Sequence, residues 1–373
     1  MKKSSKTQRG ATVAESKPAQ VVGLDLGDRQ SHYCMLTGTG EAVEEGRIQT
    51  TAAAMEKYFA SEPRMRIALE AGTHSPWVSR LLKSYGHQVI VANPRKIPTL
   101  TKSESKNDRN DAEQLARMAA FDPKLLHPIE HRSPERQQDL NLIHTRSVLV
   151  RARTMLINSA RGLVKSAGQR LPGCSSEAFP QKAPAAVPPA LKAACTPLLE
   201  QITQMNQTIT AMDKQIDQLD QKYPEITLLR TVPGVGPVVA ACYVLTLDSP
   251  QAMETNRQAG AYLGLRPRQK KSGDSDPQCK ITRMGNTYLR SLLVQSAQHI
   301  LGRSRPDSEL RRWGLKLAAS GGKRGKKRAV VAVARKLAVV LLSMWRNRKK
   351  FEPFPQSVAQ LNHRLTLSTQ TVV

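Results

Sequence analysis

The strand signals of this chain are confined to its first third, and this restricts the fold more than any other feature. Short apolar runs bounded by turn residues recur up to residue 94 and alternate with helix-type segments. After Ser133 the strand signals vanish, and apolar residues recur at helical spacing instead. The chain is therefore predicted to combine an α/β part with an all-α part.

The first part contains five predicted strands and three predicted helices in the order βββαβαβα. The strands are VVGLDLG (21–27), HYCMLTGTG, EEGRIQT, RIALEAG (66–72) and HQVIVANP (87–94). The helices are TAAAMEKYFASE, WVSRLLKSYG and NDAEQLARMAAF. This order predicts a mixed sheet covered by helices.

Two long helices are predicted in the middle of the chain, and both show a seven-residue repeat. From Ser133 to Gly168, leucines recur every seven residues and each is followed by a second apolar residue. After a Pro-, Ala- and Ser-rich linker or loop (172–189), a second heptad series follows: Leu198, Ile202, Met205, Ile209, Met212, Ile216 and Leu219. A coiled coil between subunits and a helical hairpin within one chain fit this pattern equally well.

These patterns predict five segments, in line with the two or three domains expected from a chain of 373 residues. They are a disordered basic arm (1–19), an α/β domain (20–130), a helical coiled-coil region (131–225), a mainly helical domain (226–350) and a loose tail (351–373).

The charge of the chain indicates a polyanionic partner. It has 57 Lys and Arg against 30 Asp and Glu, a formal net charge of +27, and this surplus favours nucleic acid over an anionic membrane surface. A basic surface kept for solubility is the simpler alternative. The five cysteines form no CxxC pair, no signal peptide is visible, and Arg335 and Lys336 interrupt the longest apolar stretch. We therefore expect a soluble cytoplasmic protein that does not enter the membrane.

Four carboxylates are candidate metal ligands. Asp25 and Glu70 each lie within an otherwise apolar strand, where an unpartnered charge is costly. Asp108 and Asp111 are three residues apart, on one face if this segment is helical. Four converging carboxylates would need divalent cations, and their hard oxygens suit Mg²⁺ or Mn²⁺ and two-metal phosphodiester chemistry. Taken singly, Asp108 or Asp111 is more often a helix cap, and Asp25 can be a turn residue.

The second half offers candidate nucleic-acid contacts. In LLRTVPGVGPVVAACYVL (228–245), Gly234 and Gly236 allow a tight turn between two helices, which predicts a helix-hairpin-helix that grips phosphates; a turn between core helices is the alternative. Residues 310–351 hold many Lys and Arg and no Asp or Glu, a nucleic-acid contact or a solvated charge run. The predicted contacts are Gly234, Gly236, Arg266, Arg268, Lys270, Lys271, Lys323, Arg324, Lys326, Lys327 and Arg328.

Ser272 is flanked by Lys271 and lies among these cations, which would stabilise its alkoxide and attract a phosphate. No histidine lies close to it in sequence to act as its base. From spacing alone, Ser272 is an ordinary loop serine.

At these residues the chain resembles the IS-one-ten family, the DEDD transposases of bacterial insertion sequences. VVGLDLGDRQSHYCML, IALEAGTHSPWVSRLL, VIVANPRKI and KNDRNDAEQLARMA are similar to the RuvC-like (RNase H-like) domain of the family. TVPGVGPVVAA, YLGLRPRQKKSG and ITRMGNTYLRSLLVQSA resemble its C-terminal transposase domain. The resemblance covers residues 20–300.

The resemblance implies that Asp25, Glu70, Asp108 and Asp111 are the DEDD ligands and that Ser272 forms a 5′-phosphoserine with cleaved DNA. Members often carry two serines before the glycine, whereas Lys271 stands at the first position here, and Ser275 is the alternative nucleophile. It further implies donor and target DNA and a bridge RNA as partners, a dimer or tetramer with composite sites, and a location at the bacterial nucleoid. A RuvC-like Holliday-junction nuclease that uses water and a non-catalytic nucleic-acid-binding protein are the alternative functions.

Overall fold

The computed structural model describes residues 20–97, 108–273, 275, 277, 279–320 and 322–355, apart from the side chains of Asp108 and Lys323. The predicted arm 1–19 and residues 356–373 of the predicted tail lie outside the described residues. The chain divides into two compact units, Met1–Arg132 (unit 1) and Ser133–Val373 (unit 2). The finer division at residues 225 and 226 stays a prediction.

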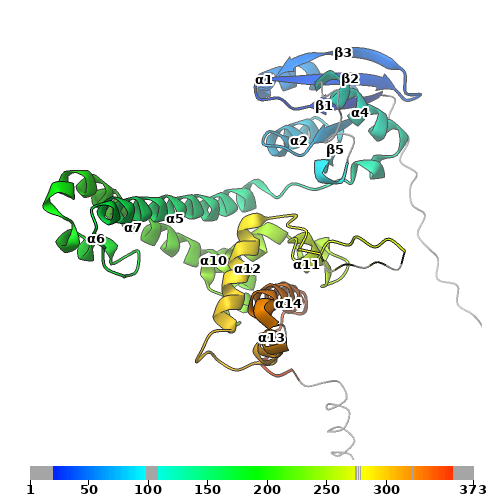
Figure 1. Cartoon of the computed structure of the whole chain (residues 1–373). Helices are drawn as coiled ribbons and strands as arrows, with labels where there is room; N and C mark the ends of the chain where they lie inside the picture. The colour runs from blue at the N-terminus through cyan, green and yellow to red at the C-terminus, as the bar shows by residue number, and fades with distance from the viewer. Residues whose placement is uncertain are drawn as a thin grey trace, which may run out of the picture. The chain divides into compact units, whose positions relative to one another are not determined.

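Unit 1 contains a five-stranded mixed sheet with the strand order β3-β2-β1-β4-β5 (Figure 1). The first three strands form an antiparallel meander, and β4 and β5 continue the sheet parallel to β1. The predicted order βββαβαβα is confirmed. The elements are β1 (Gln20–Asp25), β2 (Gln30–Thr37), β3 (Ala42–Gln49), α1 (Ala52–Phe59), β4 (Arg66–Glu70), α2 (Ser75–Ser84), β5 (Gln88–Ala92) and α4 (Asp108–Phe121).

The two faces of this sheet are covered by different helices. Val22 and Leu24 of β1 share a buried cluster with Phe59 of α1 and Leu82 of α2, so these helices cover one face. Because side chains alternate along a strand, the residues between and beside them point to the opposite face.

Helix α4 covers that opposite face, where Val21 and Ala68 pack with Leu115. The helix lies unusually close to the sheet at Gly23. A Cβ on Gly23 would come within 1.9 Å of the carbonyl oxygen of Ala112, so only glycine fits under the helix at this point of β1.

Unit 2 is helical (Figure 1). Its helices are α5 (Pro134–Ser166), α6 (Phe179–Lys182), α7 (Lys192–Asp217), α8 (Leu219–Lys222), α9 (Pro224–Leu229), α10 (Pro237–Leu247), α11 (Gln258–Tyr262), α12 (Thr287–Ile300), α13 (Glu309–Ser320) and α14 (Gly325–Asn347). Short 3-10 helices lie at Pro94–Lys96 and Pro123–Leu126 in unit 1, and at Pro184–Ala186, Pro189–Leu191, Pro250–Ala252 and Gly322–Arg324 in unit 2. The prediction of an α/β part followed by a helical part is confirmed.

Helices α5 and α7 form an antiparallel hairpin within the chain. Leu140 near the start of α5 shares a cluster with Ile216 near the end of α7, and Val164 near the end of α5 shares another with Cys195 near the start of α7. Of the two heptad series in α5, the buried one is the series after the leucines, since Leu163 itself is exposed. The hairpin interpretation of the heptads is therefore confirmed; self-association remains a prediction.

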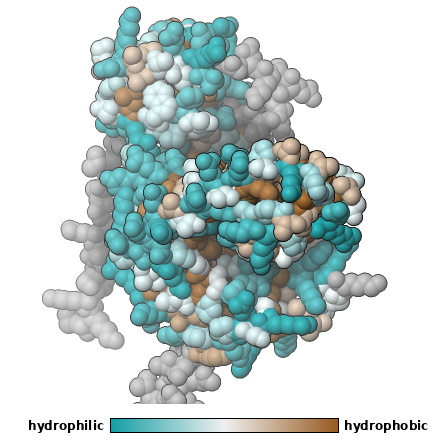
Figure 2. Space-filling view, turned by 90° about the vertical axis from the view of Figure 1, so that its left-hand side faces the viewer, coloured by the Kyte–Doolittle hydropathy of each residue, from teal (hydrophilic) through white to brown (hydrophobic). Residues whose placement is uncertain are grey.

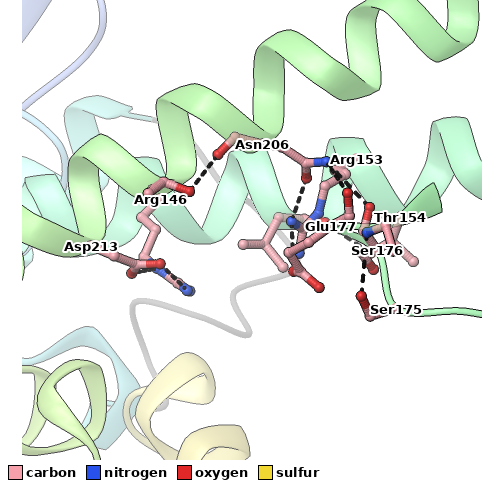
Figure 3. Close-up of polar contacts among 11 residues, drawn as sticks. Arg146, Arg153, Thr154, Ser175, Ser176, Glu177, Asn206 and Asp213 are labelled. Atoms are coloured by element: carbon pink, nitrogen blue, oxygen red, sulfur yellow. Dashed lines mark hydrogen bonds and ion pairs between the residues drawn. The ribbon is translucent and has the colours of Figure 1, made fainter. Parts of the chain in front are cut away.

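Two arginines of α5 hold the hairpin together by polar contacts (Figure 3). Arg146 makes a two-pronged ion pair with Asp213 of α7. Arg153, only 8% exposed, donates to Glu177 at 3.0 Å and to Asn206 of α7 at 2.7 Å. Because a buried guanidinium without partners is costly, these contacts fix the register of α5 against α7.

The connection between α5 and α7 is packed against the hairpin rather than open. Phe179, Ala183 and Val187 of this Pro- and Ala-rich segment are buried in the same cluster as Val164.

Figure 2 shows the molecule from the side of α6: hydrophilic side chains cover most of that face, with a smaller hydrophobic patch among them.

Helix α10 is central to unit 2: it packs against α5, α7, α9 and α12, and its residues from Ala240 to Leu247 are all buried. The hydroxyl of Tyr243 donates to the carbonyl of Ala338 in α14 at 2.6 Å.

Residues at the start of the predicted loose tail are packed, because the Phe351 amide donates to the Thr231 hydroxyl at 3.1 Å. None of the helices in the described segments combines the length and apolarity that a membrane crossing requires.

Candidate metal site and nucleic-acid surfaces

Asp25 and Glu70 lie side by side at one edge of the sheet. Strands β1 and β4 are parallel with Leu24 opposite Leu69, so the next residue of each strand is an acid at the same level. Both acids are half-buried. Alternation places them on the face that carries Gly23, which is the face covered by α4.

Helix α4 brings its acidic first turn to the same edge. Ala112 lies against Gly23 in the middle of β1, and the guanidinium of Arg66 at the start of β4 donates to Ala119 at 3.0 Å. The helix therefore runs antiparallel to both strands, so its N-terminal end lies towards their carboxyl ends. Asp111 in this turn is 5% exposed. Asp108 is the first residue of α4, and its side chain lies outside the described residues.

The donor set at this edge fits a hard divalent cation, because it consists of carboxylate oxygens from adjacent strand ends and from the helix above them. Among the described side chains, no three His, Cys, Asp or Glu groups lie close enough together to hold an ion. The backbone thus brings Asp25, Glu70 and Asp111 to one edge and one face of the sheet. Their described side chains are not close enough to one another to coordinate a single ion.

His74 and Asp28 lie at the same edge and were not singled out from the sequence. They follow Glu70 and Asp25 by four and three residues, and His74 Nε2 lies 3.8 Å from a carboxylate oxygen of Asp28. The indole of Trp77 donates to His74 Nδ1 at 3.1 Å, which fixes the ring. The signal available in the sequence was their position just after the two acidic strand ends.

A buried serine and a half-buried histidine fix the loop after β4. The hydroxyl of Ser75 lies 2.9 Å from His131 Nε2, and it accepts from the Gly72 amide at 3.0 Å. Burial, together with nearby Arg80 and other cations, lowers the pKa of His131. Ser75 is fully buried, so this pair anchors the loop beside Glu70.

The PGVGP segment forms a tight turn between α9 and α10, as predicted. Gly234 has φ +89°, and a Cβ there would lie 3.0 Å from the His299 ring and 3.2 Å from the Ser296 carbonyl oxygen of α12. Gly234 therefore serves close packing between helices. Gly236, with open space around it, precedes α10, and both glycines line a groove of ≈550 Å³. A contact with nucleic acid at Gly234 and Gly236 stays a prediction.

Ser272 is exposed at the turn of a loop in unit 2, called the hairpin below, whose two arms are joined by isolated antiparallel bridges. Ser272 and Ser275 exchange both backbone hydrogen bonds, at 3.0 and 3.1 Å, around a turn in which Gly273 has φ +54°. Further from the tip, the Arg268 amide donates to the Lys280 carbonyl at 3.0 Å. The segment is thus a loop, as predicted, and both candidate serines lie at its turn.

The predicted basic contacts are exposed. Arg266, Arg268, Lys270 and Lys271 lie along the first arm of the hairpin, and within the described residues none of them is in an ion pair. Around the start of α14, four more are exposed: Arg324, Lys326, Lys327 and Arg328. The side chain of Lys323 lies outside the described residues.

Two family models match the chain. The model described as a DEDD transposase matches residues 22–168, which include all four predicted carboxylates. The model described as "Transposase IS116/IS110/IS902 family" matches residues 226–311, which include the PGVGP turn and the Ser272 hairpin.

Curated proteins show the same relationship along most of the chain. A probable family 20 transposase of Pseudomonas aeruginosa is 30% identical over 68% of this chain and 77% of its own length. The transposase for insertion sequence element IS1111A of Coxiella burnetii is 24% identical over 88% and 90%, and that for element IS1328 of Yersinia enterocolitica is 26% identical over 74% and 83%. The chain therefore belongs to the IS110 family of insertion-sequence transposases, enzymes that act on DNA.

Proposed function

We propose that this transposase cuts and rejoins DNA with a serine nucleophile assisted by divalent metal ions, and that a bridge RNA guides it to donor and target DNA. The observation that carries the proposal is the edge of unit 1, where Asp25 and Glu70 end adjacent parallel strands beneath the acidic first turn of α4. An RNase H-like (RuvC-like) assignment of unit 1 is supported by the strand order 3-2-1-4-5 and by the DEDD family match.

In this proposal Asp25, Glu70, Asp108 and Asp111 hold Mg²⁺ or Mn²⁺. Bound divalent ions supply neutralisation of the scissile phosphate and stabilise the charge that develops on the attacking and leaving oxygens. The carboxylates orient the ions, and the half-buried position of Asp25 and Glu70 limits the access of water. The packed loop of Ser75 and His131 keeps the segment after Glu70 in place.

The proposed chemical step takes place at Ser272. Its hydroxyl loses a proton, the oxygen bonds to phosphorus, and the bond from phosphorus to the 3′ oxygen of the preceding nucleotide breaks. The 3′ oxygen takes up a proton and leaves as a hydroxyl, and a 5′-phosphoserine remains. Attack by a different 3′-hydroxyl reverses the step and joins new ends. The exposed tip of the hairpin and the adjacent Lys271 support this role, since both favour an approaching phosphate.

Because Ser272 belongs to unit 2 and the carboxylates belong to unit 1, the active site is proposed to be composite, with the two parts coming from different subunits of a dimer or tetramer. Helix α5 supports self-association, because Val148, Met155 and Leu163 are large exposed apolar residues seven and eight positions apart. That spacing is typical of a seam for another helix.

A suicide substrate that traps the covalent intermediate tests the nucleophile. We expect the wild-type protein and Ser275→Ala to form an adduct that survives denaturation. In Ser272→Ala the amount of adduct should fall by about 10³-fold or more, while the RNA that copurifies with the protein is retained. Persistence of the adduct in Ser272→Ala, with its loss in Ser275→Ala, would move the nucleophile by three residues. Cleavage without any adduct in the wild type would favour a nuclease that uses water.

A further inference from the structure

Unit 2 contains a second groove, of ≈580 Å³, that is separate from the groove at the PGVGP turn. It is bordered by α11, by the base of the Ser272 hairpin and by α13 and α14. The residues on which the argument rests are Arg257, Gln258, Arg266, Trp313, Arg335 and Lys336.

The groove is strongly cationic, since four of its lining residues are Arg or Lys and none is Asp or Glu. Within the described residues, the guanidinium groups of Arg257, Arg266 and Arg335 take part in no hydrogen bond or ion pair. Arg346 on the same helix α14 is different, because it donates to the Pro250 carbonyl at 2.8 and 2.9 Å. An arginine that holds the fold together has such partners. The groove arginines instead keep their N–H donors available for a ligand.

The backbone positions one of these arginines. A Cβ on Gly260 of α11 would lie 2.8 Å from Cγ of Arg335, so the absence of a side chain at Gly260 lets the Arg335 stem pack across α11. The stem is therefore held while its charged end stays exposed. This arrangement reduces the entropy lost when the guanidinium binds a phosphate.

Trp313 adds an aromatic surface to the cations. Its ring is half-buried, and Lys336 Nζ lies 4.8 Å from the ring centroid. The flat π-face of an indole is the surface on which an unpaired base stacks. When a base stacks on the Trp313 ring, the long stem of Lys336 allows its ammonium to leave the ring and bind a neighbouring phosphate.

Cations without internal partners beside an aromatic ring are the combination that single-stranded nucleic acid requires. A duplex would satisfy the cations but offers no exposed base face to a ring inside a groove. We propose that this groove binds a single-stranded segment of DNA or RNA, with its phosphates on Arg257, Arg266 and Arg335 and one unpaired base on Trp313. The site holds that strand at the base of the hairpin that carries Ser272, and it rests on the proposed function only in taking nucleic acid as the ligand.

The test measures the affinity of the full chain for a labelled 12-nucleotide strand, offered as DNA and as RNA, and for a 12-base-pair duplex at the same salt concentration. We expect Arg257→Gln/Arg335→Gln to weaken single-strand binding roughly tenfold and to flatten its salt dependence. A matched control, Lys165→Gln/Arg170→Gln, removes two exposed cations at the far end of the α5–α7 hairpin and should change single-strand binding less than threefold.

Trp313→Leu tests the stacked base. We expect it to weaken binding of the intact strand roughly tenfold, to leave duplex binding unchanged, and to have no effect on a strand of abasic sites. Equal losses for strand and duplex, or a groove variant that behaves as the control, would overturn the proposal. If Trp313→Leu fails to fold, the exposed arginine pair carries the test alone. Loss of binding for the DNA strand alone or for the RNA strand alone identifies which one occupies the groove.

Discussion

The two units of this transposase gather opposite charges by different physical means. In unit 1, acids from separate strands are brought together by the hydrogen-bond register of the sheet, which places Leu24 opposite Leu69 and the following acids side by side. In unit 2, cations are brought together by helix packing and by one extended hairpin, as at Arg266 and Arg335. A shift of one residue in the register would turn Asp25 to the other face of the sheet, whereas long cationic side chains tolerate such changes.

The sheet edge and the basic regions should therefore differ in their sensitivity to substitution. We expect conservative substitutions at the sheet edge to remove activity with little change in binding. We expect substitutions in the basic regions to change affinity gradually, because each cation contributes a similar share to phosphate binding.

The largest expected effect separates catalysis from binding. Asp25→Asn or Glu70→Gln should lower strand cleavage by about 10²- to 10⁴-fold, because each removes a negatively charged ligand from the proposed metal site. DNA affinity measured without metal should change less than threefold. Glu62→Gln is the matched control, because it neutralises an exposed acid in the same unit; this variant should cleave DNA as the wild type does. A cleavage rate in Asp25→Asn equal to that of this control would exclude the carboxylate edge from the reaction.

The next effect concerns the close approach of α4 to β1. Gly23→Ala places a Cβ 1.9 Å from the Ala112 carbonyl oxygen, so the helix must move, and we expect a loss of about 3 kcal/mol in the free energy of unfolding. Gly162→Ala in α5, with open space around it, should instead stabilise by about 1 kcal/mol. Denaturant titration of both variants measures the contrast; equal stabilities would mean that α4 does not rest on Gly23.

A smaller effect is expected at the polar contacts of the α5–α7 hairpin. Arg153→Leu removes the donor to Glu177 and Asn206 and should cost about 1–3 kcal/mol of unfolding free energy, because the half-buried Asn206 amide oxygen loses this partner and the hydrogen bonds between the two helices are lost. Arg151→Leu, exposed on the same helix, should change stability by about 0.5 kcal/mol or less. The difference in midpoint of thermal unfolding between the two variants checks this.

The smallest effect is a dependence of stability on pH. The pKa of Glu177 is held below its usual range by its own backbone amide, with help from Ser175 and Arg153. A carboxylate with a lowered pKa stabilises the fold above its unfolded pKa, and this contribution is lost as the pH falls through the folded value. Because Glu177 is mostly exposed, we expect only a few tenths of a kcal/mol after solvent screening. Glu177→Gln should remove this component of the acid-side decline; an unchanged profile would contradict it.

The sequence predicted the sheet edge well because strand periodicity is local: an acid inside VVGLDLG or RIALEAG marks its own face and level. It could not show how close α4 lies, since that depends on Gly23 meeting Ala112 across the fold. The heptads predicted two helices but did not show which helix packs against which. The contacts of Arg146 and Arg153 with α7 show that α5 and α7 of the same chain pack against each other. The groove at Trp313 was missed because its residues come from four separate segments with no common motif.

Anomalous scattering of Mn²⁺ in crystals of the protein bound to DNA would locate the metal ions at or away from the carboxylates of the sheet edge. We expect a Mn²⁺ peak in direct contact with carboxylate oxygens of Asp25 and Glu70, with Asp108 or Asp111 of α4 completing the site beside a DNA phosphate. A fully occupied Mn²⁺ site elsewhere, with Asp25 and Glu70 bound to no ion, would contradict it.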